Sequence, residues 1–267
     1  MKKRKIIFLG TTKFSYELLE FLIGNSFKIS AVFTSPKKFK ISYNQSNVKN
    51  YNYVDLSKLT KYHKIPIYKL HKNQDDKLKN RLHLIKELKP DIIIVAGWYF
   101  MIPESILKIP KYGVWGLHSS LLPKYGGGAP LVWAKIRGEK STGVTLFKMK
   151  KGVDNGEIIG QCEFDIRKTD TIKELIDKSI KASKKLLLKY INEEKIIYAK
   201  QNESSLEIFP QRSPSDGEID WDSDDPILKA MTISRKSSVL WPECTVLPPP
   251  APAPSPPPCP NTSTGSS

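Results

Sequence analysis

Short apolar runs alternate with stretches of helical periodicity along the first 190 residues. The apolar runs include residues 6–9, which end at Gly10, and the β-branched run 92–95. Apolar residues recur three and four positions apart in between, as in residues 14–23. Continuous apolar runs are typical of buried parallel strands, and the three- and four-residue spacing is typical of amphipathic helices. The pattern predicts an α/β protein.

The expected elements follow from this alternation. Strands are expected at residues 5–10, 28–34, 65–68, 92–95, 113–117, 143–149 and 157–164. Helices are expected at 14–23, 76–88, 128–137 and 171–191, and residues 40–62 are expected to form a long loop with some helix near 56–62. This order predicts a doubly wound, mostly parallel sheet. Its functional site should lie beyond the carboxyl ends of the strands, where the segments after Gly10, Val95 and Leu117 emerge.

The chain changes character beyond residue 200. Residues 213–226 contain six acidic residues and no basic one, and nine prolines lie between positions 248 and 260. A proline-rich stretch cannot pack a core and by default forms disordered, polyproline-like chain. We therefore predict a main domain at 1–200, a short C-terminal segment at 201–240 and a disordered Pro/Ser/Thr-rich tail at 241–267.

Composition argues against a membrane or secreted protein. No apolar run approaches the roughly 18–20 residues needed to cross a bilayer. The basic start is followed by only four apolar residues, whereas the core of a signal peptide needs about 7–15. We expect a cytoplasmic protein with no membrane partner.

The net charge of +16 raises nucleic acid or an anionic substrate as a partner. Only six of the 43 basic residues are arginine, the better residue for bidentate phosphate contacts. Lysine in a chain also rich in Ile, Asn and Tyr fits codon bias as well as phosphate binding. The charge leaves two interpretations open: solvated lysine faces, or a partner such as a nucleotide-bearing substrate or tRNA.

Candidate chemistry concentrates in residues 114–160. His118 directly follows an apolar strand, where a site residue is expected, and Asp154 lies in a glycine-flanked turn. By position alone, a structural histidine and a turn-forming aspartate are equally good interpretations. The turn after Gly10 lacks both G-x-G-x-x-G and Gly-Lys-Ser/Thr, which argues against a dinucleotide or P-loop site. We expect no metal ion.

Several motifs in this order resemble the formyltransferase family. They are Leu117-His-Ser-Ser-Leu-Leu-Pro-Lys-Tyr-x-Gly-Gly-Ala-Pro, Thr142-Gly-Val-Thr and Val153-Asp-Asn-Gly, with similar stretches at 8–14, 89–98 and 209–221. The resemblance covers about residues 5–230. It implies a Rossmann-like catalytic domain with a short C-terminal appendage, and 10-formyltetrahydrofolate as the formyl donor.

The same resemblance assigns the catalytic positions. The family uses an Asn, a His two residues later and an Asp in the later loop; His118 and Asp154 match the last two, and Gly116 stands at the Asn position. His118 would act as general base, oriented by Asp154. An Asn amide would stabilise the oxyanion. A second departure is Gly126, where many members carry Arg.

Gly116 leaves three interpretations open. The enzyme transfers slowly to an easy acceptor, the protein binds folate without transfer, or another group replaces the amide. The replacement donors considered are Ser119, Ser120, Asn155 and a backbone N–H. We favour a working enzyme, because a lost site would be free to lose the His and the Asp too.

The resemblance also places the pterin of the folate against the backbone near 95–98 and the loop 149–154. The implied folate-binding residues are Val95, Ala96, Gly97, Trp98, Phe100, Ile102, Met149 and Val153. Plain core packing is an equal interpretation for Phe100 and Ile102.

The acceptor amine is the least determined part of the prediction. The tRNA enzymes of the family have a sizeable C-terminal domain, whereas only about 30 foldable residues follow Trp221 here, too few for such a domain. We therefore expect a nucleotide-linked amino sugar, with methionyl-tRNA or catalytically weak folate binding as alternatives. A homodimer is one option for the oligomeric state.

Overall fold

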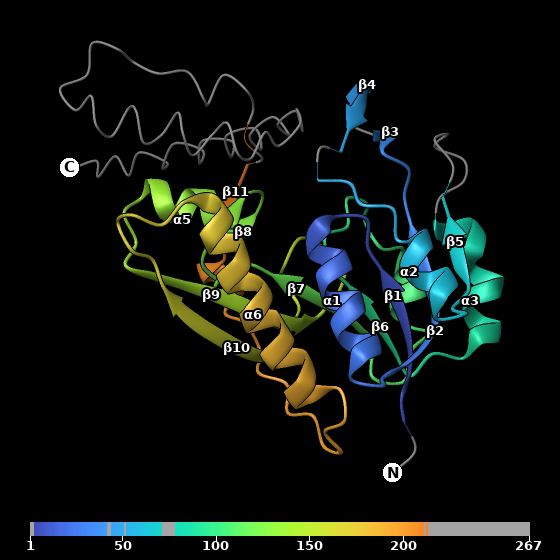
Figure 1. Cartoon of the computed structure of the whole chain (residues 1–267). Helices are drawn as coiled ribbons and strands as arrows, with labels where there is room; N and C mark the ends of the chain where they lie inside the picture. The colour runs from blue at the N-terminus through green and yellow to red at the C-terminus, as the bar shows by residue number, and fades with distance from the viewer. Residues whose placement is uncertain (1–2, 42–43, 51, 71–77, 211, 213–267) are drawn as a thin grey trace, which may run out of the picture.

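The computed structural model describes residues 3–41, 44–50, 52–70, 78–210 and 212, and a seven-stranded sheet runs through them. The strand order is β10-β9-β7-β6-β1-β2-β5 (Figure 1). The strands from β5 through β2, β1 and β6 to β7 are parallel, whereas β9 and β10 are antiparallel to their neighbours. This confirms the predicted α/β class and the mostly parallel, doubly wound sheet.

Most of these bounds follow the sequence pattern, but the helix expected at 76–88 is an α-helix only over Leu82–Leu88, and the short helix Glu104–Leu107 is not among the expected elements. The sheet strands are β1 (Lys5–Leu9), β2 (Lys28–Thr34), β5 (Ile67–Lys69), β6 (Ile92–Val95), β7 (Val114–His118), β9 (Ser141–Lys148) and β10 (Glu157–Asp165). The α-helices are α1 (Lys13–Gly24), α2 (Ser57–Tyr62), α3 (Leu82–Leu88), α4 (Glu104–Leu107), α5 (Pro130–Ile136) and α6 (Ile172–Tyr190). Short 3₁₀ turns, η1 (Leu78–Arg81) and η2 (Glu203–Ser205), complete the helical elements of the described residues.

Two core layers explain why the central strands are apolar without interruption. Ile6 and Phe8 of β1 pack on one face with leucines of α1 and α6, which lie in front of the sheet in Figure 1. Ile7 and Leu9 pack on the other face with side chains of α3 and α4. Successive side chains of a strand point to opposite faces, so a sheet covered on both faces needs apolar residues at every position.

Residues 40–62 differ from the expected loop. The helix expected near 56–62 is present as α2, but β3 (Lys38–Ile41) and β4 (Asn44–Lys49) pair as an antiparallel hairpin ahead of it. Phe39 and Ile41 alternate with lysines in the four residues of β3, but β4 is polar, with Val48 as its one apolar residue. A four-residue alternation without a matching pattern in the partner strand is a weak signal for a hairpin.

A third sheet, of two strands, is not among the expected elements. β8 (Gly126–Gly127) pairs in parallel with β11 (Ile208–Phe209). A pair of glycines is typical of turns rather than strands, so this pairing depends on a partner far along the chain.

Part of the C-terminal prediction lies outside the described residues. Of the expected segment 201–240, the structure describes 201–210 and 212, and the tail at 241–267 is wholly outside. The three-segment division stays a prediction. Within the described part of the chain, no helix is both long and apolar enough to span a bilayer.

Candidate active site

A loop after β9 brings Asp154 to His118, although β9 itself leads away from His118. His118 ends β7 opposite Thr145 of β9, and β9 then runs antiparallel until Lys148 lies opposite Trp115. The following loop folds back, so that Asp154 Oδ2 lies 3.3 Å from His118 Nδ1. The side chains are only 10% and 17% exposed, which shields their attraction from water and salt. The pair therefore has the geometry of an imidazole oriented by a carboxylate.

Both imidazole nitrogens of His118 face hydrogen-bond acceptors. His118 Nε2 lies 2.7 Å from the backbone oxygen of Tyr125. A carbonyl oxygen and a carboxylate both only accept hydrogen bonds, and the contact at Nε2 is shorter than the 3.3 Å from Nδ1 to Asp154 Oδ2, so we assign the proton of the neutral ring to Nε2. The lone pair is then at Nδ1, beside Asp154. In the neutral ring this lone pair and the carboxylate are both acceptors; once Nδ1 takes up a proton, its N–H can donate to Asp154, which then orients the ring and stabilises its charge.

Asp154 is itself held by two backbone contacts. The N–H of Gly127 donates to Asp154 Oδ2 at 2.8 Å, and Gln201 Nε2 donates to the Asp154 backbone oxygen at 2.9 Å. Tyr125 and Gly127 thus lie in one short loop that contacts both His118 and Asp154. Gly127 has a φ of +87°, and a Cβ there would stand 2.4 Å from the Phe209 backbone oxygen. Only glycine fits this position without strain.

Gly116 is next to both halves of the site. It pairs with Val95 of β6 on one side and with Phe147 of β9 on the other. A Cβ at position 116 would stand 2.7 Å from Phe147 Cε1 and 3.2 Å from Met149 Cγ. The space that any side chain at position 116 would enter is therefore filled by the Phe147 ring.

The side chains considered as replacement donors have partners elsewhere. Ser119 Oγ lies 2.8 Å from Ser179 Oγ of α6, and Ser120 Oγ donates to the Lys124 oxygen at 2.7 Å. Asn155 Nδ2 donates to the Lys151 oxygen at 3.2 Å. Ser120 is thereby committed as a donor, whereas either hydroxyl can donate in the Ser119–Ser179 pair and Asn155 Nδ2 keeps a second N–H, so Ser119, Asn155 and a backbone N–H stay open as donors.

Several of the expected folate-binding residues belong to the hydrophobic core or pack against it. Val95 and Ile102 belong to the core beneath the loop, with Trp98 and Met149 packed against that core. Ala96 is buried, its oxygen accepting a hydrogen bond from Ser15 Oγ at 2.6 Å, whereas Val153 is 37% exposed. For Val95 and Ile102, core packing is therefore the simpler interpretation.

The loop after β6 has features that suit a ligand. Gly97 has a φ of +58°, and a Cβ there would stand 2.1 Å from Thr12 Oγ1, so the loop lies tightly against the start of α1. Trp98 and Phe100 meet edge to face with ring centroids 5.5 Å apart. Trp98 Nε1 is buried and has no hydrogen-bond partner among the described residues. A buried N–H is costly unless it is paired, and an acceptor atom of a pterin would satisfy it.

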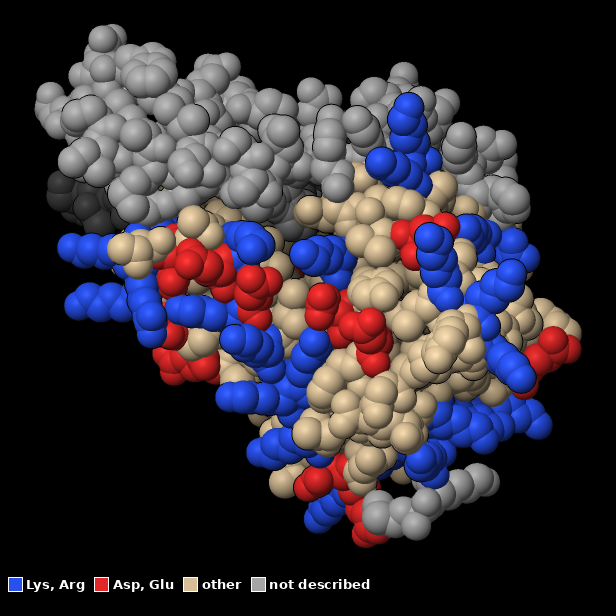
Figure 2. Space-filling view, viewed as in Figure 1, with Lys and Arg blue, Asp and Glu red and all other residues tan. Residues whose placement is uncertain are grey.

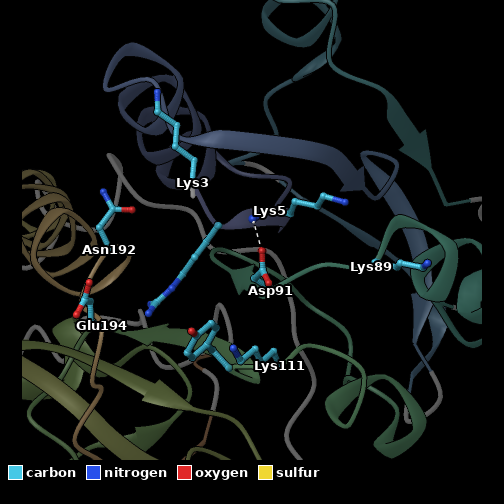
Figure 3. A pocket seen from close by; sticks show the side chains of 9 residues that line it. Lys3, Lys5, Lys89, Asp91, Lys111, Asn192 and Glu194 are labelled. Atoms are coloured by element: carbon cyan, nitrogen blue, oxygen red, sulfur yellow. Dashed lines mark hydrogen bonds between the residues drawn. The ribbon is translucent and has the colours of Figure 1, made fainter. Parts of the chain in front are cut away.

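A separate hollow lies at the other end of the parallel strands, where β1, β6 and β7 begin. It has a volume of about 860 Å³ and is lined by residues that include Lys5 at the start of β1, Asp91 before β6 and Lys111 before β7. Figure 3 shows the Lys5 backbone N–H donating to Asp91, a bond of 2.7 Å. Because His118 lies at the carboxyl end of β7, this hollow is not part of the formyl-transfer candidate. Among the described residues, no cluster of three or more His, Cys, Asp or Glu side chains is arranged to hold a metal ion.

Comparison with known proteins identifies the family. The family model described as formyl transferase matches residues 4–191. The methionyl-tRNA formyltransferase of Alkaliphilus oremlandii is 33% identical over 241 residues, which cover 89% of this chain and 74% of the relative. The chain belongs to the formyl transferase family. The donor expected from the sequence, 10-formyltetrahydrofolate, is the donor that this family uses.

Other members of the formyl transferase family support this assignment. The methionyl-tRNA formyltransferase of Clostridium perfringens strain 13 is 37% identical, covering 81% of this chain and 69% of its own. The solved methionyl-tRNA formyltransferase of Clostridium thermocellum covers 87% of this chain and 82% of its own, with a TM-score of 0.57 and 19% identity. The solved sugar 3N-formyltransferase WlaRD covers 88% and 78%, with a TM-score of 0.58 and 20% identity. At such identities the two structures establish the shared fold alone.

Proposed function

We propose that this formyl transferase formylates the amino group of methionyl-tRNA, with His118 as general base and Asp154 orienting it. The observation that carries the acceptor is the similarity to methionyl-tRNA formyltransferases, from 33% identity over 241 residues to 37% over 223. These relatives favour the alternative raised from the sequence over the nucleotide-linked amino sugar.

The proposed chemistry follows from the two nitrogens of His118. The amine nitrogen forms a bond to the formyl carbon, and the bond from that carbon to the folate nitrogen breaks. His118 Nδ1 takes the proton that the amine loses and returns it to the departing folate nitrogen. The Nε2–H bond to the Tyr125 oxygen, 2.7 Å long, keeps the ring in the tautomer that has its lone pair at Nδ1. Asp154 stabilises the charged ring.

Gly116 affects the expected rate. At the proposed Asn position, the chain offers no side-chain amide to the oxyanion, and removing one such donor costs about 10²–10³ in rate. A backbone N–H, Ser119 or Asn155 then carries the stabilisation. We therefore expect a working but slow enzyme.

A nucleotide-linked amino sugar remains the second candidate acceptor. WlaRD resembles this chain as closely in fold as the solved methionyl-tRNA enzyme does. The face in Figure 2 does not discriminate between the two acceptors, since its Lys and Arg side chains are spread among Asp and Glu rather than gathered in one basic patch.

An acceptor panel tests the proposal. The purified protein receives 10-formyltetrahydrofolate and, separately, charged initiator methionyl-tRNA, a dTDP-linked amino sugar or no acceptor, and the appearance of tetrahydrofolate is measured. We expect release that depends on methionyl-tRNA and falls steeply with salt, because tRNA binding displaces counterions from phosphates. Release with the amino sugar alone would refute the acceptor, and folate binding without release on any amine would refute the catalytic proposal.

A further inference from the structure

The segment after η2 adds a strand to the loop that contacts the His118–Asp154 pair. The N–H groups of Gly126 and Gly128 donate to the oxygens of Glu207 and Phe209, both at 2.8 Å. These bonds form one side of the β8–β11 ladder. The glycine loop is thereby tied to residues about 80 positions further along the chain.

Aromatic packing reinforces this ladder. The Phe209 ring stacks on Tyr125, with centroids 4.9 Å apart and planes at 25°, and lies 5.5 Å from the Trp133 ring. Trp133 Nε1 donates to the Pro210 oxygen at 2.9 Å, and the Arg137 guanidinium lies 4.5 Å from the Phe209 centroid. Phe209 therefore stands at the centre of a cluster that holds β11 on the loop.

Tyr125 connects the aromatic cluster to the catalytic pair, because both its side chain and its backbone make hydrogen bonds. Its hydroxyl donates to Glu139 Oε1 at 2.7 Å. Burial, and then the hydrogen bond to the Glu139 carboxylate, raise the pKa of Tyr125 to about 12, so the hydroxyl remains a donor at neutral pH. Its backbone oxygen is the partner of His118 Nε2.

A glycine loop needs such external support. Residues 126–128 are three glycines in a row, and glycine loses more conformational freedom on ordering than any other residue. The loop nevertheless provides the Tyr125 oxygen for His118 and the Gly127 N–H for Asp154. A small displacement of a catalytic group costs up to about 100-fold in rate, so whatever orders this loop affects the chemistry.

We propose that Phe209 is a positioning residue for formyl transfer: by anchoring β11 on the glycine loop, it keeps the Tyr125 oxygen on His118 Nε2 and so sets the tautomer of the general base. This proposal rests on the proposed function for its kinetic consequence only. Phe209 acts through Tyr125 and the loop.

The test compares Phe209→Ala with the matched control Ile208→Ala. Ile208 lies in the same strand, is 57% exposed and takes no part in the ring stack. Long-range proton–nitrogen NMR of protein labelled with ¹⁵N-histidine reports the tautomer of His118, whose signals are those lost in His118→Ala. Steady-state kinetics give kcat and the folate KM, and circular dichroism reports folding.

We expect wild type and Ile208→Ala to hold the proton on Nε2. In Phe209→Ala the two tautomers should both be populated, and kcat should fall about 10- to 100-fold with little change in the folate KM. Phe209→Tyr keeps the ring and should restore both readouts. If Phe209→Ala does not fold, Phe209→Leu, which keeps much of the apolar volume without the ring stack, is judged by the same criteria.

Two results would overturn the proposal. One is a His118 tautomer in the folded Phe209 variant that matches Ile208→Ala. The other is a lower kcat accompanied by an unchanged tautomer. If no amine supports turnover even in wild type, the proposed function fails, but the tautomer comparison still decides whether Phe209 positions His118.

Discussion

Gly116 and Phe147 face each other across β7 and β9, and the Phe147 ring takes the space into which a side chain at position 116 would extend. An ideal Cβ on Gly116 would stand 2.7 Å from Phe147 Cε1 and 2.8 Å from Cζ. Where an Asn is expected, the chain therefore has a glycine, and the neighbouring Phe147 ring fills the space of the missing side chain.

This pairing predicts that Gly116→Asn alone will not gain activity. The new Cβ overlaps the Phe147 ring, and overpacking of this kind costs about 1–3 kcal/mol of stability. Phe147→Leu removes the Cε1 and Cζ atoms that block the space. We expect the double variant to gain kcat, towards the roughly 10²–10³ that one oxyanion donor contributes. Urea unfolding and kcat for both single variants and the double variant measure the coupling; a gain in Gly116→Asn alone would contradict it.

His118→Ala and Asp154→Asn should each lower turnover. General acid–base catalysis contributes about 10²–10⁴ in rate, so we expect kcat to fall by at least about 10² in His118→Ala. Asp154→Asn loses the carboxylate beside Nδ1, 3.3 Å away, and should fall by a similar order. Exposed His63 provides the control His63→Ala, which should match wild type. Wild-type rates in His118→Ala would remove it from the mechanism.

Gly97→Ala should weaken folate binding as well as stability. Its Cβ would meet Thr12 Oγ1 at 2.1 Å and force the loop that carries Trp98 away from α1. Gly138 is the matched control: its φ is +70°, but a Cβ there has nothing within 4 Å. Gly138→Ala should lower the free energy of unfolding only by the cost of a left-handed backbone conformation, about 1–2 kcal/mol. Urea unfolding and folate titration separate the two, and equal behaviour would refute the close-approach argument.

Asp170 should make stability depend on pH at the start of α6. Burial opposes the Asp170 charge, but the hydrogen bonds from Lys178 Nζ at 2.7 Å and the Arg167 N–H at 2.8 Å outweigh it and hold the pKa of Asp170 below its usual value. A lowered folded-state pKa adds stability above the unfolded pKa of about 3.9, and this stability is lost as pH falls through the folded value.

Asp170→Asn is therefore expected to destabilise the protein at pH 7 by about 1.5–3 kcal/mol, the range for a hydrogen bond to a charged group. The difference from wild type should shrink as pH falls below about 4. Urea unfolding at a series of pH values measures it. Asp177→Asn on the exposed surface of α6 is the control, and a difference that persists unchanged at low pH would contradict the assignment.

Most of the sheet was predictable because strands that are buried on both faces consist of uninterrupted apolar residues. β2 and β6 match the expected bounds, and the long helix α6 differs by one residue at each end. The β3–β4 hairpin and the β8–β11 pair were missed, since backbone ladders in mostly polar or glycine segments leave little side-chain pattern.

Local pattern and motif order were enough to establish the α/β sheet, the formyl donor and the nomination of His118 and Asp154. Three features depended on the folded chain: the Tyr125 oxygen on His118 Nε2, the Phe147 ring in the space beside Gly116, and the support of the glycine loop by Phe209. Each is a contact between residues that different strands and loops bring together, and one of the three is made by a backbone atom that every residue type carries. Periodicity records which face of an element is buried, but not which atom lies opposite.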